Sequence, residues 1–116
     1  MSTNAAEFFA KFKDGMEQVR QITPDALKGF GALFQSVMKD GAIKAKEKEL
    51  IALGIAVAQR CEPCIRLHVQ KCLDAGNRPE EIMEAAGVAV MMQGGPAYTH
   101  LPVVLETINA LRKPQP

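Results

Sequence analysis

Residues 44–60 read KAKEKELIALGIAVAQR, a charged opening followed by an almost continuous apolar run. The run, residues 50–58, contains no polar side chain and is 9 residues long, whereas a helix that spans a membrane needs about 20. We interpret the segment as one helix that is apolar on nearly every side. Such a helix belongs at the centre of a helical bundle or in a subunit interface.

The chain before this segment carries the pattern of two amphipathic helices. Apolar residues recur at steps of three and four over residues 8–19 and again over residues 27–38, which is the spacing of one helix face. Pro24 suits the start of the second helix, with Thr23 as a candidate cap. Asp40-Gly41 is expected to end it.

Three further helices are expected after Arg60. One begins near Cys61 and stops at Ala75-Gly76, which is a natural carboxy-terminal cap. Another opens at Pro79 and is broken by Gly94-Gly95-Pro96. The last runs over about 101–111. The sequence therefore predicts an all-α, single-domain bundle of about six helices over residues 1–116, with a motif core at about 43–111 and a frayed tail at 113–116.

Composition narrows the class of protein. A chain of 116 residues suits one domain. Its net charge of +1, one Tyr and no Trp argue against a nucleic-acid partner. The amino terminus has neither a basic start nor an apolar run, unlike a secretory signal. We therefore expect a soluble, cytoplasmic protein without a membrane partner.

The cysteines at positions 61 and 64 are the residues most indicative of chemistry. In a reducing compartment, Cys61-Glu-Pro-Cys64 indicates redox chemistry or metal binding more often than a structural disulfide. Pro63 fits a first helical turn, where unpaired N–H groups and the helix dipole favour a thiolate. The three-residue step also puts the two sulfurs within disulfide reach. His68 follows Cys64 by one turn on the same helix face and could exchange a proton with it.

Metal binding is the main alternative interpretation of these residues. Cys61, Cys64, His68 and Cys72 have the order of four zinc ligands. Cys64 and Cys72 would lie about 12 Å apart along a helix, however, whereas zinc ligands lie about 2.0–2.3 Å from the metal. We therefore predict no metal site and expect Cys72 to be a small buried residue.

Two other polar residues carry little signal by themselves. Glu49 precedes Cys61 by twelve positions and, from spacing alone, is one of several charges in a solvated first helical turn. His100, near the start of the last helix, fits a surface or cap residue.

The chain resembles the carboxymuconolactone decarboxylase family, in its alkylhydroperoxidase D-like branch, over about Ile43 to Leu111. Three motifs carry the resemblance: Lys48-Glu49-Leu50-Ile51, Cys61-x2-Cys64-x3-His68, and Ala75-Gly76-x2-Pro79-Glu80-Glu81-Ile82. The resemblance implies an all-helical fold that assembles as a homotrimer or homohexamer. It also implies an active site in a helical pocket near subunit contacts.

The resemblance assigns roles to four residues. Cys64 matches the cysteine that meets peroxide, and Cys61 matches its more accessible partner. His68 and Glu49 match a proton relay. Pro63 departs from the pattern, because the alkylhydroperoxidase has a second histidine at that position.

The leading hypothesis is a thiol-dependent peroxidase or disulfide reductase that acts on an organic hydroperoxide or a disulfide. No flavin, haem or nicotinamide motif is present, so we expect no cofactor, and electrons must come from an external dithiol. A thioredoxin-like or lipoyl protein fits the family. One alternative is a dithiol–disulfide exchange or redox-sensing module without peroxidase activity. Another is a decarboxylase-type lyase or small-ligand binding protein in which the cysteines are bystanders.

Overall fold

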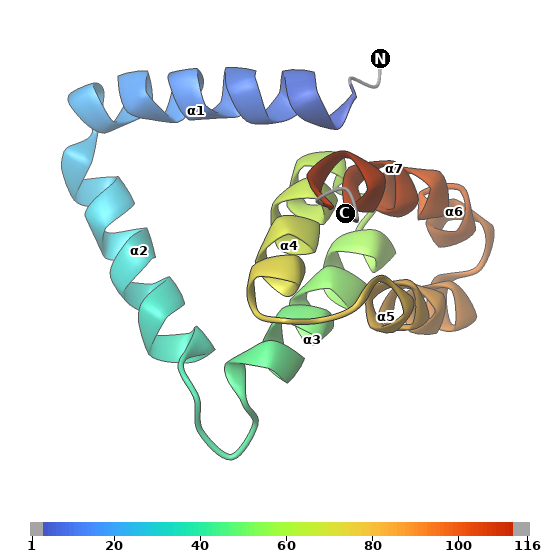
Figure 1. The fold of residues 1–116 in the computed structure, drawn as a ribbon. Helices are drawn as coiled ribbons and strands as arrows, with labels where there is room; N and C mark the ends of the chain where they lie inside the picture. Colours follow the sequence, from blue (N-terminus) through green and yellow to red (C-terminus); the bar gives the residue numbers. More distant parts are fainter. Residues whose placement is uncertain (1–3, 113–116) are drawn as a thin grey trace.

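The computed structural model describes residues 4–112, and the tail expected to fray, residues 113–116, lies outside this range. The described chain is helical, with no strand, which confirms the predicted all-α class (Figure 1). Its elements are α1 (Ala5–Ile22), α2 (Pro24–Met38), α3 (Ala45–Ala58), α4 (Glu62–Asp74), α5 (Pro79–Gln93), α6 (Gly95–Tyr98) and α7 (Leu101–Leu111). Six of these match the predicted helices. The short α6 is an additional turn that begins within the Gly94-Gly95-Pro96 break.

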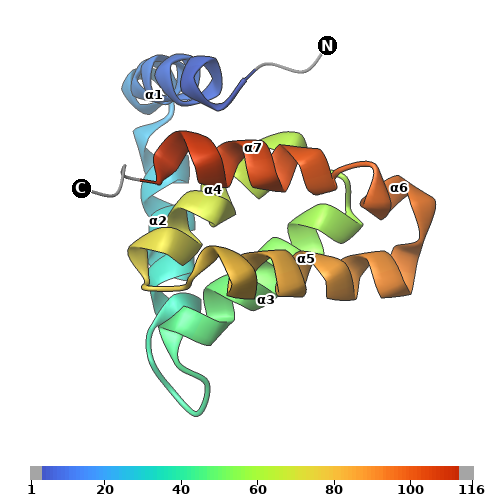
Figure 2. The same ribbon diagram turned by 45° about the vertical axis from the view of Figure 1, so that its right-hand side comes forward.

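Helix α3 lies at the centre of a globule formed by α3–α7, where α4 and α5 pack against it and α7 covers α4 (Figures 1 and 2). One face of α3 is buried in the hydrophobic core through Leu53, Ala56 and Val57. The opposite face leaves Ile51 and Ile55 exposed. One side of α3 thus belongs to the hydrophobic core, and the other side forms an exposed apolar surface.

Helices α1 and α2 form an arm, residues 5–38, that extends away from the globule (Figures 1 and 2). Helix α2 contains no buried residue although its apolar stripe is helical as predicted. The Cα radius of gyration is 14.7 Å, compared with about 13 Å for a compact domain of this length. The first two helices therefore differ from members of a closed bundle, because much of their apolar surface is exposed, as at Phe30 and Leu33.

Both ends of the arm are held by hydrogen bonds to the globule. At its start, the backbone N–H of Ala5 donates to both carboxylate oxygens of Glu106, each at 3.2 Å. The same carboxylate binds the buried guanidinium of Arg66 at 2.6 Å. At the end of α2, Lys48 Nζ donates to the carbonyls of Val37 and Lys39, both at 2.7 Å. Charged side chains of the globule thus fix where the arm begins and ends.

Thr23 lies in the turn between α1 and α2. Thr23 occupies the cap position before Pro24, but its side chain makes no capping hydrogen bond to α2. Its hydroxyl donates instead to the carbonyl of Val19 at 3.2 Å, one turn back in α1. Thr23 is therefore the cap residue of α2 as expected, and its hydroxyl is satisfied by this local carbonyl and not by an N–H of α2.

Glu106→Ala is expected to loosen the arm. Hydrogen bonds to charged groups contribute roughly 1.5–3 kcal/mol, and this carboxylate is half-exposed, so we expect a loss of about 1–2 kcal/mol in the free energy of unfolding. Urea denaturation and the rate of proteolytic cleavage within α1 measure the effect. Glu84→Ala, at an exposed position on α5, is the control. Equal cleavage rates in the two variants would contradict this account of the anchor.

Candidate redox site

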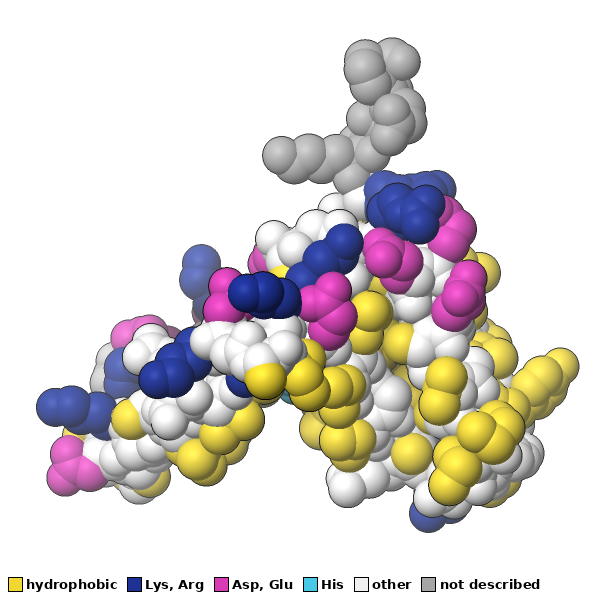
Figure 3. All heavy atoms as spheres, turned by 90° about the horizontal axis from the view of Figure 1, so that it is seen from below, with side chains coloured by type: hydrophobic (Ala, Val, Ile, Leu, Met, Phe, Trp, Pro, Cys, Tyr) yellow, Lys and Arg dark blue, Asp and Glu magenta, His cyan; other side chains and the backbone are white. Residues whose placement is uncertain are grey.

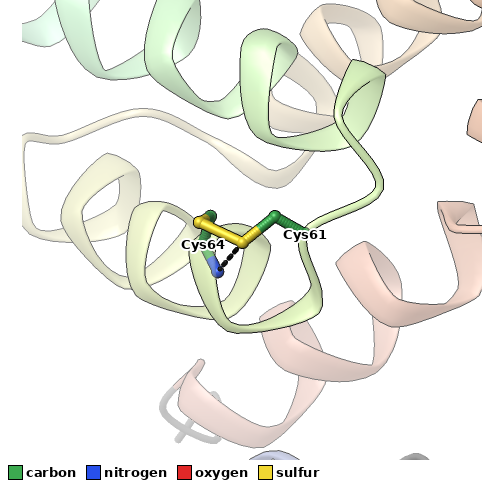
Figure 4. The surroundings of a disulfide bond; sticks show 2 residues. All are labelled: Cys61 and Cys64. Carbon is green, nitrogen blue, oxygen red and sulfur yellow. Dashed lines mark hydrogen bonds between the residues drawn. A yellow bond between two sulfur atoms is a disulfide. The ribbon is translucent and has the colours of Figure 1, made fainter.

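The Cys61–Cys64 pair lies at the amino terminus of α4 (Figure 4). Cys61 is the residue that caps the helix, and Pro63 lies in the first turn, as the sequence predicts. The two sulfurs form a disulfide, with the Cα atoms 5.2 Å apart. Cys61 Sγ also accepts a hydrogen bond from the backbone N–H of Cys64 at 3.2 Å. A donor in this position stabilises negative charge on Cys61 when the pair is reduced.

The backbone before the pair is fixed by the end of α3. Arg60 has a φ of 56°, the left-handed conformation that commonly ends a helix. Its N–H donates to the carbonyl of Val57 at 3.0 Å, and the N–H of Cys61 donates to that of Ala56 at 3.1 Å. Cys61 is therefore held by the last turn of α3 and, at the same time, caps the first turn of α4.

A histidine–carboxylate pair lies beside α4. His68 Nδ1 is 2.9 Å from Glu49 Oε1. The side chains are 21% and 9% exposed respectively, so Glu49 is buried and not solvated as its position in a charged first turn suggested. A carboxylate that accepts from Nδ1–H fixes the ring orientation and leaves Nε2 to exchange protons. Both residues belong to the same chain, one on α3 and the other one turn after Cys64 on α4.

Two residues beside His68 were not singled out by sequence reasoning. The ring of Phe34, on α2, is stacked against that of His68, with centroids 6.3 Å apart and planes at 28°. Lys71 Nζ lies 4.7 Å from the centroid of the same phenylalanine. The sequence indicated only that Phe34 belongs to the apolar stripe of its helix. Its contact depends on where the arm lies, which local sequence does not specify.

Cys72 is fully buried within the hydrophobic core, as expected for a small apolar side chain. Burial raises the pKa of its thiol to about 12, and the nearby negative charge of Glu49 acts in the same direction. The thiolate is the nucleophilic form of cysteine. The protonated, covered sulfur of Cys72 is therefore chemically distinct from the pair at the start of α4.

The burial of Cys72 predicts a difference in alkylation between the folded and unfolded protein. At about pH 8, where free thiols are partly ionised, iodoacetamide should modify Cys61 and Cys64 of the reduced native protein and leave Cys72 unmodified. After unfolding, all three should react. Intact mass spectrometry counts the adducts, and Cys72→Ala should give equal counts in both states. Modification of all three native thiols at one rate would contradict this assignment.

The four candidate zinc ligands, Cys61, Cys64, His68 and Cys72, do not form a metal-binding cluster. Over residues 4–112, no three His, Cys, Asp or Glu side chains are arranged to hold a metal ion. His100 occupies the cap position before α7, where its Nδ1 lies 2.8 Å from the carbonyl oxygen of Pro96. That position agrees with its interpretation as a surface or cap residue.

The family model of the carboxymuconolactone decarboxylase family matches residues 24–106, which include α2 to α6, most of α7 and all four site residues. The chain belongs to this family. A relative from Paracoccus denitrificans, named uncharacterized protein 4 in cox locus, is 38% identical over 82 residues, 71% of this chain and 74% of its own.

Solved structures of the carboxymuconolactone decarboxylase family have the same fold. A family protein from Legionella pneumophila superposes with a TM-score of 0.89 at 34% identity, covering 94% of this chain and 97% of its own. One from Thermotoga maritima gives 0.69 at 33% identity, covering 75% and 90%. The latter is described with a suggested involvement in antioxidative response. The arm is thus matched along with the globule in the Legionella protein.

An apolar groove of about 420 Å³ lies between α3 and α5, apart from the cysteines. Its nine lining residues are aliphatic, Met or Gly, among them Leu50, Ile55, Val88 and Met92. None can act as a general acid or base, which gives the lyase alternative no catalytic group there. Figure 3 shows how apolar side chains gather on one face of the molecule.

Within residues 4–112, no helix is both long and apolar enough to cross a membrane.

Proposed function

We propose that this protein is a thiol-dependent peroxidase of the alkylhydroperoxidase D-like branch, with Cys64 as the nucleophile. One observation carries the proposal: a cysteine pair at a helix amino terminus is followed, one turn on, by a partly buried Glu49–His68 hydrogen bond. A helix terminus that favours a thiolate and a histidine oriented by a carboxylate are the two requirements of an activated cysteine. The family resemblance assigns that role to Cys64. The description of the Thermotoga relative agrees with this chemistry.

The oxidative half of the cycle consumes one peroxide. The Cys64 thiolate attacks the terminal oxygen of an organic hydroperoxide, the O–O bond breaks, and the leaving alkoxide takes a proton to become the alcohol. His68, oriented by Glu49, supplies that proton. Cys64 is now a sulfenic acid, which the Cys61 thiol attacks with loss of water to give the Cys61–Cys64 disulfide.

The reductive half requires an external dithiol. Its thiolate attacks Cys61 Sγ, which forms a mixed disulfide and releases Cys64 as a thiolate. The second thiol of the reductant then attacks its own sulfur in the mixed disulfide and releases Cys61. We propose a thioredoxin-like or lipoyl protein of the cytoplasm as this dithiol, since both carry paired thiols.

We also propose that the protein is a homotrimer or homohexamer. Phe30 and Leu33 on the arm, with exposures of 67% and 59%, and the α3–α5 groove leave apolar surface uncovered in one chain. Apolar surface of this kind is typical of interfaces. Sedimentation equilibrium measures the assembly, and a monomer at micromolar concentration would overturn this part of the proposal.

The function is tested by mixing the fully reduced protein with an organic hydroperoxide and following intact mass and peroxide concentration. The expected result is rapid loss of two hydrogens from the protein, with one peroxide consumed per disulfide formed. Peroxide loss no faster than with a free small thiol, with the protein thiols intact, would overturn the proposal.

Dithiol–disulfide exchange is the second candidate, and Pro63 favours it. Proline cannot transfer a proton, so position 63, in the first turn of α4, supplies no second relay group between the two cysteines. This candidate predicts rapid oxidation of Cys61 and Cys64 by a protein disulfide and negligible oxidation by peroxide. The same mass measurement, with an oxidised thioredoxin-like protein as the oxidant, separates the two functions.

A further inference from the structure

Phe34 differs from Phe30 and Leu33, two other large apolar residues of α2. Helix α2 has no buried residue, and Phe30 and Leu33 are mostly exposed. Phe34, on the same helix, is half-buried because its ring is stacked against His68. The arm therefore contacts the candidate proton relay through an aromatic side chain.

We propose that Phe34 is a positioning residue of the relay, which covers the His68 imidazole and holds it in hydrogen-bonding contact with Glu49. The inference rests on the proposed function and adds that the site is complete only when the arm lies against the globule. The ring of Phe34 is stacked against that of His68, so we infer that it acts through the histidine.

Three contacts around His68 and Phe34 support this role. Glu49 fixes one edge of the imidazole through Nδ1 at 2.9 Å. The Phe34 ring covers a face of the imidazole, an arrangement that contributes about 0.5–1.5 kcal/mol beyond area burial. Lys71 Nζ, 4.7 Å from the Phe34 centroid, adds a cation–π contact that holds the phenyl ring. His68 nevertheless keeps 21% of its side-chain surface exposed, enough for proton exchange with solvent or substrate.

The arm is constructed so that this contact could open without unfolding the core. Its fixed points are hydrogen bonds at Ala5 and at the end of α2, donated to or by charged side chains of the globule. Between them α2 buries no side chain completely. Displacing α2 would uncover His68 while the core residues of α3, α4 and α5 stay packed.

The first experiment compares Phe34→Ala with Gln35→Ala, which truncates an exposed polar side chain of the same helix. Modification of histidine by diethyl pyrocarbonate, followed by peptide mass spectrometry, reports imidazole access, and His100 is an internal reference in every sample. We expect His68 in Phe34→Ala to react roughly three- to tenfold faster than in the wild type, in line with the loss of one aromatic contact. Gln35→Ala should match the wild type.

The second measurement is the single-turnover rate of Cys61–Cys64 disulfide formation. Phe34→Ala should slow it by a similar factor, and Phe34→Tyr, which keeps the ring, should restore both rates. Thermal unfolding checks that each variant is folded. Wild-type reactivity of His68 in Phe34→Ala would overturn the inference, whether or not the protein reduces peroxide. Thiols that survive peroxide in the wild type would overturn the proposed function instead, and the histidine measurement would still decide the role of Phe34.

Discussion

Cys64→Ser is expected to reduce peroxide consumption to the background of buffer alone. The substitution removes the sulfur that attacks the peroxide and leaves a hydroxyl that is not ionised at neutral pH, so neither the sulfenic acid nor the disulfide can form. A coupled assay with a dithiol reductant measures the steady-state rate, and intact mass shows the oxidation state. Unchanged turnover would remove Cys64 from its proposed role.

Two matched variants separate the three sulfurs. Cys61→Ser should still consume one equivalent of peroxide and then stop as a Cys64 sulfenic acid, which dimedone labels. Cys72→Ala should keep wild-type turnover, because the Cys72 thiol is buried and its pKa is raised to about 12. If Cys61→Ser were the inactive variant and Cys64→Ser accumulated the sulfenic acid, the roles of the pair would be reversed.

Glu49→Gln is expected to slow thiol oxidation about 100-fold, at the lower end of the roughly 10²–10⁴ that general acid–base catalysis contributes. Glutamine is nearly the same size as the buried glutamate and can still accept a hydrogen bond from His68 Nδ1. It lacks the negative charge that stabilises the imidazolium when His68 takes up a proton. Rapid-mixing measurements of disulfide formation over a range of pH give the rate.

Glu47→Gln provides the control, because Glu47 lies two residues before Glu49 in α3 but is exposed. It should oxidise at the wild-type rate. The disulfide of Glu49→Gln should still form fully at long times, since both cysteines remain. Equal rates in Glu49→Gln and wild type would show that the hydrogen bond at 2.9 Å is structural.

Helix positions could be predicted from local sequence because proline, glycine and spacing act locally. Pro24 and Pro79 begin α2 and α5, and Gly76, with a φ of 95°, follows the end of α4. The cysteine pair lies at the expected helix start for the same reason. The short α6 was not expected, because two of its four residues belong to the Gly-Gly-Pro segment that was interpreted only as a helix break.

Contacts between helices could not be predicted in this way. The spacing of Glu49 placed it among solvated charges, and only the family resemblance paired it with the site. Its burial depends on α4 lying against α3, which no local pattern specifies. The amphipathic stripe of α2 was recognised, but a stripe does not reveal which surface it will face, so neither the arm nor the Phe34–His68 contact was foreseen.

The position of Cys61 between two helix ends affects how readily the pair can change its oxidation state. Its N–H is bound by the last turn of α3, and its sulfur caps the first turn of α4. Because hydrogen bonds hold the backbone of Cys61 on both sides, we expect the bond to Cys64 to break and re-form mainly by rotation of the cysteine side chains. The gain or loss of two electrons should then need little movement of the helices.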